Sequence, residues 1–164
     1  MTREEFLNEI LTQYDVVKIL SSNNGNRILR LRHKKQGKDI VVRSYPKPVL
    51  AYQELKSIAH QNISTVYDSL LFEDGQIVLE EFVNGITVAQ VLEQGNYTYH
   101  GAKKIIQGVA QALIALRELN IVHRDIKPEN IMIECSGNIK LIDFNASRIH
   151  CDNKKADTTI LGTI

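Results

Sequence analysis

Two patterns of hydrophobic and polar positions divide the chain near Glu81. Before this residue, short apolar runs alternate with polar turn signals, among them the Asn-Asn-Gly-Asn segment at 23–26. Short runs bounded by Gly and Asn predict β-strands joined by tight turns. We therefore expect an antiparallel sheet built mostly of hairpins, with five strands at residues 15–20, 28–31, 40–42, 66–72 and 77–79.

Helical spacing marks three further stretches. Thr2 with Glu5 three residues later is a capping-box pattern, which predicts a short N-terminal helix. Apolar residues at helical spacing predict one helix near residues 49–59. A strong amphipathic repeat predicts a longer helix over residues 102–116.

Beyond the long helix, two short strands are expected at residues 131–134 and 139–142, and the polar C-terminal stretch is expected to be a loop. The predicted fold class is α+β. We expect an N-terminal helix at 1–13, a β-rich lobe with one main helix at 14–82, and an incomplete, mostly helical lobe at 83–164.

Composition narrows the class of protein. The chain of 164 residues has 20 Lys and Arg against 19 Asp and Glu, a formal net charge of +1. This balance argues against nucleic-acid binding by bulk electrostatics. No stretch has the pattern of a secretory signal or a membrane span. Two cysteines form neither a disulfide framework nor a metal quartet, so a cytoplasmic location is expected.

The segment 123–130, His-Arg-Asp-Ile-Lys-Pro-Glu-Asn, carries the densest chemistry. Asp125 is suited to accept a hydroxyl proton, and Lys127 to neutralise charge on a transferred phosphoryl group. Asp143 follows the second short strand, and a hairpin would bring it to the same end as Asn130. An amide oxygen and a carboxylate suit Mg²⁺, which takes substrate phosphates as further ligands. The spacing indicates a phosphoryl-transfer site, with turn-capping residues as the alternative.

The same run, followed by an Asp-Phe pair, closely resembles the catalytic and metal-binding loops of eukaryotic-like serine/threonine protein kinases. The resemblance implies that Asp125 is the catalytic base and that Lys127 lies next to the phosphate. It also implies that Asn130 and Asp143 are the magnesium ligands. Asn145 stands where the family has a glycine, and we expect it to reduce loop freedom rather than remove the metal.

The resemblance extends to a nucleotide-binding lobe, in which the family has a glycine-rich loop. Ser21, Asn23 and Asn26 stand where the three glycines belong, and Gly25 is the glycine that is left. Backbone amides of such a loop can cradle phosphates, although side chains crowd a close approach. Without the family, the segment is a hairpin turn.

Two charged residues match the family's phosphate anchor. Arg43 stands at the position of a strand lysine, and Glu54 resembles the helix glutamate that pairs with it. Arginine keeps the charge but is longer, planar and forked, so the exchange is not neutral at a phosphate site. A surface ion pair, or no pair, is the alternative.

The segment 77–85 resembles the hinge between the two lobes. The resemblance implies that Glu80 holds the gatekeeper position and that Glu81 and Val83 line the adenine. Ile28 would form part of the apolar wall around the base. An edge strand with an exposed acidic pair is the alternative reading of the same residues.

The last residues resemble the end of an activation segment. The resemblance implies phosphorylation at Thr158 or Thr159, with Arg124 as the partner of the phosphate, and contact of Thr163 with the catalytic loop. The family's later elements are missing from the sequence. We therefore expect a domain truncated after the activation segment, whose exposed apolar surface favours a homodimer.

The function expected from the resemblance is transfer of the ATP γ-phosphoryl group to a Ser or Thr hydroxyl of a protein substrate, with Mg²⁺, in a chain of bacterial character. One alternative is a pseudokinase-like module that binds nucleotide or a partner without turnover, which the exchange at Arg43 favours. A small-molecule kinase is a third alternative, and the Lys-Pro-Glu-Asn run argues against it.

Overall fold

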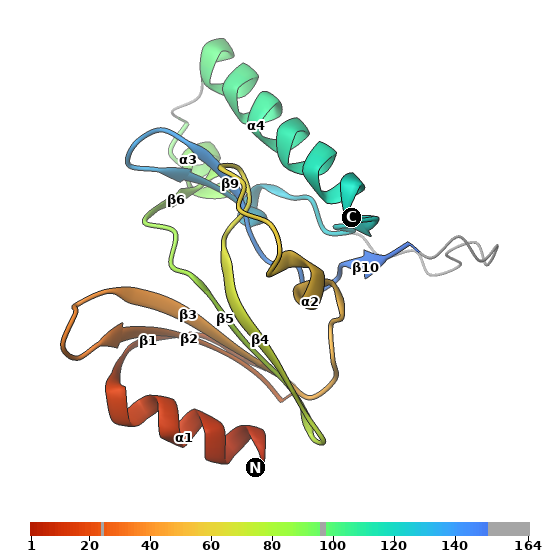
Figure 1. The fold of residues 1–164 in the computed structure, drawn as a ribbon. Coiled ribbons are helices and arrows are strands. Elements are labelled where there is room, and N and C mark those ends of the chain that lie inside the picture. The colour runs from red at the N-terminus through yellow and green to blue at the C-terminus, as the bar shows by residue number, and fades with distance from the viewer. Residues whose placement is uncertain (24, 96–97, 151–164) are drawn as a thin grey trace. The chain divides into compact units, whose positions relative to one another are not determined.

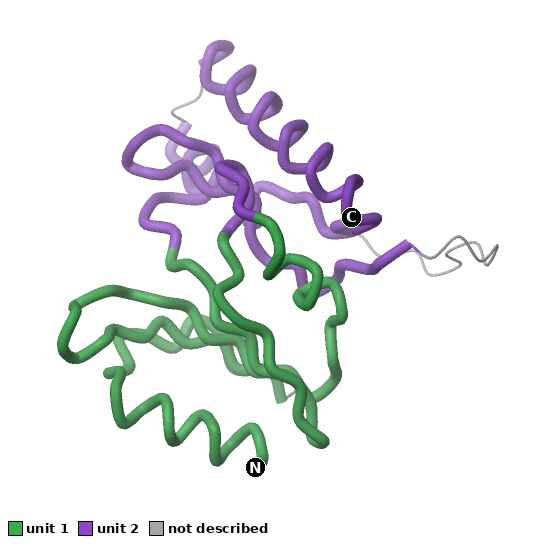
Figure 2. Tube along the Cα trace, viewed as in Figure 1, with its two compact units in different colours: residues 1–58, 65–82 green, residues 59–64, 83–164 purple. Residues whose placement is uncertain are grey.

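The computed structural model describes residues 1–23, 25–95 and 98–150. The chain divides into two compact units, shown in different colours in Figure 2. Unit 1 comprises Met1–Ile58 and Thr65–Phe82. Unit 2 comprises Ala59–Ser64 and the chain from Val83 onward. Each unit has its own β-structure and its own helices.

Unit 1 is built on the expected five-stranded antiparallel sheet, and Figure 1 shows its strands side by side. The strand order is β1-β2-β3-β5-β4, so that β5 lies between β3 and β4 in the interior of the sheet. The strands are β1 (Tyr14–Asn23), β2 (Asn26–His33), β3 (Asp39–Tyr45), β4 (Val66–Phe72) and β5 (Gly75–Glu81).

Tight turns join the strands where the sequence places Gly and Asn. The β1–β2 hairpin closes at the pair Asn23 and Asn26, with Gly25 at a φ of 78°. The β4–β5 hairpin closes at Phe72 and Gly75. At Gly75, which has a φ of 139°, a Cβ would lie 2.0 Å from the carbonyl oxygen of Tyr45, so only glycine fits there.

Helix α1 (Arg3–Gln13) covers one face of this sheet (Figure 1). The capping box is confirmed, since the Thr2 hydroxyl accepts from the backbone of Glu5 and the Glu5 carboxylate accepts from the backbone of Thr2. The apolar stripe of the helix packs into the main core of the unit. That core comprises Leu7, Ile10, Leu29, Leu31, Ile40, Val42 and Ile77.

Helix α2 (Ala51–Leu55) packs on the opposite face, where the ring of its Tyr52 stacks on Tyr45 with centroids 5.9 Å apart. The helix is shorter than the predicted stretch 49–59. Its first residues and those after it make i→i+3 bonds instead of continuing the helix, and the Ser57 hydroxyl bonds the carbonyl of Glu54 at 2.7 Å. A serine that bonds nearby backbone in this way competes with helix propagation.

Unit 2 contains two small sheets, one of order β6-β8-β9 and one of β10 with β7. The predicted long helix is confirmed as α4, slightly extended at both ends. Short strands β8 and β9 match the two runs expected after it. The elements are β6 (Gly85–Thr87), α3 (Val88–Glu93), α4 (Tyr99–Glu118), β7 (Ile121–Val122), η1 (Pro128–Asn130), β8 (Ile131–Glu134), β9 (Ile139–Leu141) and β10 (Arg148–Ile149).

Close backbone packing holds α4 against β9. At Gly108 a Cβ would lie 2.6 Å from the Cβ of Ile139, so the helix can approach the strand only because this residue has no side chain. Segment 59–64 crosses beside β9 and forms an isolated parallel bridge between Ile63 and Leu141. Among the described helices, none combines the length and apolar character that crossing a membrane requires.

Candidate functional site

The catalytic-loop candidates lie between β7 and β8 in unit 2, and short-range bonds hold them together. Lys127 Nζ is 2.8 Å from Asp125 Oδ2, and Asn130 Nδ2 donates to the same oxygen at 2.9 Å. Asn130 Nδ2 also donates to the backbone carbonyl of Asp125 at 2.9 Å. The three predicted residues therefore form one cluster, although Asp125 and Lys127 remain partly open to solvent.

Charge and burial compete at this cluster. Partial burial raises the pKa of the Asp125 carboxyl, but the hydrogen bonds from Lys127 and Asn130 outweigh it and leave that pKa below its usual value. The hydrogen bond to Asp125 raises the pKa of the Lys127 ammonium. Asp125 is therefore an ionised acceptor near neutral pH, and Lys127 is a fixed cation beside it.

The oxygen-ligand candidates are adjacent through the backbone. The backbone N–H of Ile142 donates to the carbonyl of Asn130 at 2.9 Å, which places Asp143 next to Asn130. Asn130 is buried, and its amide nitrogen makes the bonds to Asp125, so the amide oxygen is the group suited to a cation. Among the described residues no cluster of three His, Cys, Asp or Glu side chains is placed to hold a metal ion.

Backbone strain concentrates at the same place. Arg124 and Asp143 adopt φ values of 69° and 64°, which residues with a Cβ rarely adopt. Asp143 Oδ1 accepts from the backbone N–H of Asn145 at 3.3 Å, a local bond typical of Asx turns. The glycine-like conformation thus falls on Asp143 rather than on Asn145, so the substitution at Asn145 does not meet a left-handed backbone here.

His123 bonds the backbone of the catalytic-loop candidates, and Phe144 packs against the His123 ring. The His123 Nδ1 accepts from the backbone N–H of Asp125 at 3.3 Å, and its Nε2 lies 3.2 Å from the carbonyl of Ile142, so the ring is neutral with its proton on Nε2. Burial lowers the pKa of His123 and favours this neutral form. The ring of Phe144 meets it edge-on at 4.9 Å. Thr158, Thr159 and Thr163 lie outside the described residues.

The predicted nucleotide-loop residues lie in the β1–β2 hairpin of unit 1. Asn23 and Gly25 are exposed, and Ser21 and Ile28 are half-buried. The hairpin reading of the sequence is confirmed by the Asn23–Asn26 closing pair. Contact of these residues with phosphate stays a prediction.

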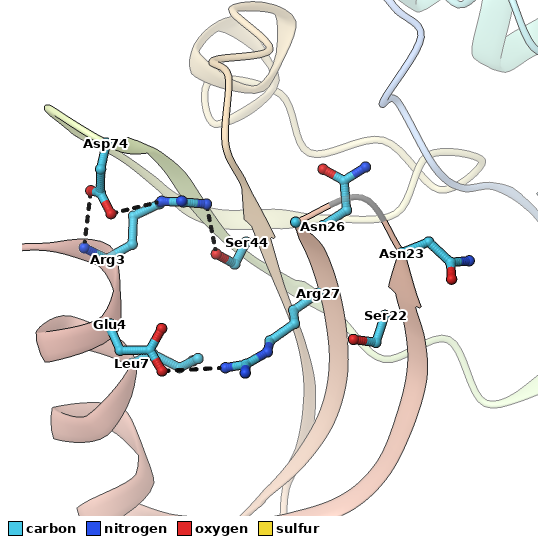
Figure 3. Close-up of a pocket in the computed structure, with 10 residues that line it drawn as sticks. Arg3, Glu4, Leu7, Ser22, Asn23, Asn26, Arg27, Ser44 and Asp74 are labelled. Atoms are coloured by element: carbon cyan, nitrogen blue, oxygen red, sulfur yellow. Dashed lines mark hydrogen bonds and ion pairs between the residues drawn. The ribbon is translucent and has the colours of Figure 1, made fainter.

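A polar pocket of about 380 Å³ lies between this hairpin and α1 (Figure 3). Arg3 bonds Asp74 and Ser44 across it, and Arg27 pairs with Glu4. Its two arginines are thus balanced by two carboxylates that attach α1 to the sheet. Ser44 faces this pocket, and successive strand side chains point to opposite faces, so Arg43 next to it points to the other face.

Arg43 forms a buried ion pair, but not with the predicted partner. Its Nε donates to Glu80 Oε1 at 2.6 Å, and the two side chains are only 6% and 2% exposed. Glu54 is exposed on α2, whose buried face comprises Ala51, Tyr52 and Leu55, and no bond to Arg43 is found for it within the described part of unit 1. The expected pairing of Arg43 with Glu54 is therefore not formed in this structure, because Glu54 lies on the exposed face of α2.

The hinge candidates Glu80, Glu81 and Val83 lie at the end of β5 and just after it. Glu80 is buried on the interior strand β5, which excludes the edge strand with an exposed acidic pair. Glu81 Oε2 accepts from the backbone N–H of Thr65 at 3.0 Å, and Val83, which begins the second part of unit 2, is buried. The resemblance gave Glu80 the gatekeeper position, but sequence reasoning missed its partner. The sequence signal for this pair was the two-residue alternation along β5, which places Val78 and Glu80 on one face. This alternation identifies Arg43 as the neighbour only when the pairing of β3 with β5 is known.

Comparison with known proteins agrees with this geometry. A model of the protein kinase domain matches residues 21–164. The chain is 29% identical over 136 residues to a probable serine/threonine-protein kinase PknB of Lactococcus lactis, covering 82% of this chain and 21% of that protein. It is 30% identical over 168 residues to an Aurora kinase of Eremothecium gossypii, covering 94% of this chain and 45% of that protein.

A further relative is a serine/threonine-protein kinase 36 of Pongo abelii, 25% identical over 163 residues, which cover 93% of this chain and 12% of that protein. The chain thus spans less than half the length of each of these relatives. The family match covers most of the chain, including the catalytic loop and the strands that carry Arg43 and Glu80. The chain therefore belongs to the protein kinase family, as a serine/threonine kinase by resemblance to these relatives.

Proposed function

We propose that this chain carries the catalytic residues of a serine/threonine protein kinase, which transfers the γ-phosphoryl group of ATP to a Ser or Thr hydroxyl of a protein substrate. The observation that carries the proposal is the cluster of Asp125, Lys127 and Asn130, in which both side-chain bonds to the aspartate end on Oδ2. Within the described residues this leaves Oδ1 as the oxygen directed to a substrate hydroxyl.

The cluster suits phosphoryl transfer in two ways. Asp125 would orient the substrate hydroxyl through Oδ1 and accept its proton as the hydroxyl oxygen bonds the γ-phosphorus and the bond from that phosphorus to the bridging oxygen of ADP breaks. Its lowered pKa keeps it ionised, so orientation of the hydroxyl contributes more than basicity. Lys127, with its raised pKa, stays charged and stabilises negative charge on the transferred group.

Asn130 and Asp143 are the residues that would hold Mg²⁺. Their donors are an amide oxygen and a carboxylate, the hard oxygen ligands this cation prefers, and Ile142 brings them together by its bond to Asn130. When bound, the cation neutralises charge on the nucleotide phosphates. For the nucleotide itself we propose the hairpin residues and the hinge residues named from the resemblance, namely Ser21, Asn23, Gly25, Ile28, Arg43, Glu81 and Val83.

Calorimetric titration of the chain with a non-hydrolysable ATP analogue tests the proposal. We expect binding that strengthens at least tenfold when Mg²⁺ is added, and a loss of this gain in Asp143→Asn, because the variant keeps the shape but not the carboxylate charge. Asp68→Asn, which removes an exposed carboxylate of unit 1, is the matched control and should keep the gain. Absence of nucleotide binding in folded protein would contradict the proposal.

The second candidate function is a module that binds nucleotide or a partner without turnover. The specific observation in its favour is the arginine at the strand-lysine position, held in a buried pair with Glu80. Magnesium-dependent binding without transfer to a generic Ser- and Thr-containing protein substrate, such as casein, would select this candidate. Transfer that disappears in Asp125→Ala would select the enzyme.

We further propose that the chain works in the cytoplasm and forms a homodimer through α4. Exposed apolar side chains on this helix, including Ile106 at 68% and Ile114 at 61% exposure, would be covered by a second copy. Sedimentation velocity over a hundredfold range of concentration tests the dimer. A species that remains monomeric throughout would contradict it.

A further inference from the structure

The strand pairing puts Arg43 and Glu80 on one face of the unit 1 sheet. Arg43 on β3 lies opposite Val78 on β5, and Glu80 is two residues beyond Val78. Residues two apart on a strand point to the same face, so Glu80 is the diagonal neighbour of Arg43 across adjacent strands. Long side chains reach each other at this spacing, as the bond of 2.6 Å confirms.

Burial of Arg43 and Glu80 makes the free-energy cost of separating the two charges high. The side chains are 6% and 2% exposed, so neither charge is hydrated as it would be at the surface. A buried charge that loses its partner is strongly unfavourable, whereas an exposed ion pair contributes little. The bond to Glu80 is therefore one contact that fixes the position of the Arg43 guanidinium, and the hydrogen-bonded ladder between β3 and β5 brings Glu80 to it.

The chemistry of the guanidinium suits a second acceptor. Arginine presents five N–H donors in a planar fork, and the bond to Glu80 is made by Nε, at the base of that fork. A carboxylate held at Nε fixes the plane of the group and the direction of its terminal nitrogens. A lysine ammonium has no such plane and would not be oriented in this way.

We propose that Glu80 is the positioning residue that holds Arg43 toward the phosphates of the bound nucleotide, in place of a glutamate on the helix. This inference rests on the proposed function, because it takes nucleotide phosphate as the ligand of Arg43. Because Arg43 and Glu80 both lie on strands of the unit 1 sheet, this phosphate anchor would keep its orientation whatever the position of α2, and Glu54 would take no part in it.

The experiment compares the affinities of the chain for ATP and for adenosine, because their ratio isolates the phosphate contacts. We expect Glu80→Gln to reduce the preference for ATP roughly tenfold while adenosine affinity changes by less than about twofold, the loss expected for one charge-assisted contact. Glu9→Gln, which removes an exposed carboxylate on α1, is the matched control. In an Arg43→Met background, Glu80→Gln should cause no further loss of preference.

A purely structural role would lower both affinities together with the melting temperature, and that result would overturn the inference. If Glu80→Gln does not fold, Glu80→Asp decides by the same ratio, since it keeps the charge and moves it by one methylene group. An equal loss of preference in Glu54→Gln would also overturn the inference, because the helix glutamate would then share the task.

The failure of this inference can be told apart from failure of the proposed function. Wild-type protein that prefers ATP, with a preference unchanged in Glu80→Gln, overturns the inference alone. Wild-type protein that binds ATP and adenosine equally also overturns it, while nucleotide binding stands. Wild-type protein that binds neither overturns the proposed function and this inference with it.

Discussion

The two charged clusters of this protein are held in different ways. In unit 2, Lys127 and Asn130 both bond Asp125 within a single loop, and the side chains of Asp125 and Lys127 are partly open to solvent. In unit 1, Arg43 and Glu80 come from strands far apart in the sequence and are almost fully buried. A local cluster can be recognised from a short motif, whereas a pair made across a sheet depends on strand order and register.

We expect the largest effect of any substitution on phosphoryl transfer to come from the cluster in unit 2. Asp125→Ala removes the acceptor of the substrate proton, and we expect it to reduce phosphoryl transfer by roughly 10²–10⁴-fold, the usual contribution of a positioned general base. Nucleotide affinity should stay within about threefold, because the side chain is directed to the hydroxyl substrate. Transfer to a protein substrate and calorimetric titration measure the two quantities, and persistent transfer would contradict the assigned role.

Substitutions in the buried pair of Arg43 and Glu80 should instead affect mainly the free energy of unfolding. Glu80→Ala leaves the guanidinium of Arg43 buried without this carboxylate, and we expect the free energy of unfolding to fall by about 3–5 kcal/mol. The double variant Arg43→Met, Glu80→Leu should recover most of this loss, because an apolar pair of similar volume avoids desolvating charge. Urea denaturation measures both. Equal losses in the single and double variants would show that the pair itself is not the cause.

A partly exposed ion-pair network on the same sheet allows a third, smaller test. Hydrogen bonds from Arg32 and Arg30 lower the pKa of Asp39 to about 2. A lowered carboxyl pKa adds stability above the unfolded-state value and loses it as pH falls through the folded-state value. We expect Asp39→Asn to lower the free energy of unfolding by about 1–2 kcal/mol at pH 7, with the difference from wild type vanishing between about pH 4 and pH 2. Chemical denaturation at several pH values measures it, and a difference independent of pH would contradict the electrostatic origin.

Much of the fold follows from hydrophobic spacing and turn residues. The sequence predicts the five strands, the capped first helix and the long amphipathic helix; β4 has the predicted bounds, and the other four strands of the unit 1 sheet are longer than predicted. Strand β2 (Asn26–His33) extends beyond the predicted run because Arg30 and Arg32 bond Asp39, and Arg30 also stacks on Phe82 at 3.9 Å. Charged residues with such partners continue a strand as well as apolar ones do.

Other elements could not have been predicted from local pattern. Strands of two or three residues, such as β7 and β10, exist only because distant segments pair: Arg148 with Val122 and Ile149 with Ile121. The early end of α2 coincides with the bond of the Ser57 hydroxyl to the carbonyl of Glu54. A one-dimensional pattern does not contain these pairings.

The sequence by itself identified the residues of the proposed catalytic loop, because the groups that bond one another lie within a few positions along the chain. It also determined the β-rich and helical parts, since each has its own hydrophobic period. Only the tertiary structure decided that Glu80, rather than Glu54, is the partner of Arg43. The physical reason is that a buried charge must find its counterion where the folded backbone brings one, and the β3–β5 register brings Glu80.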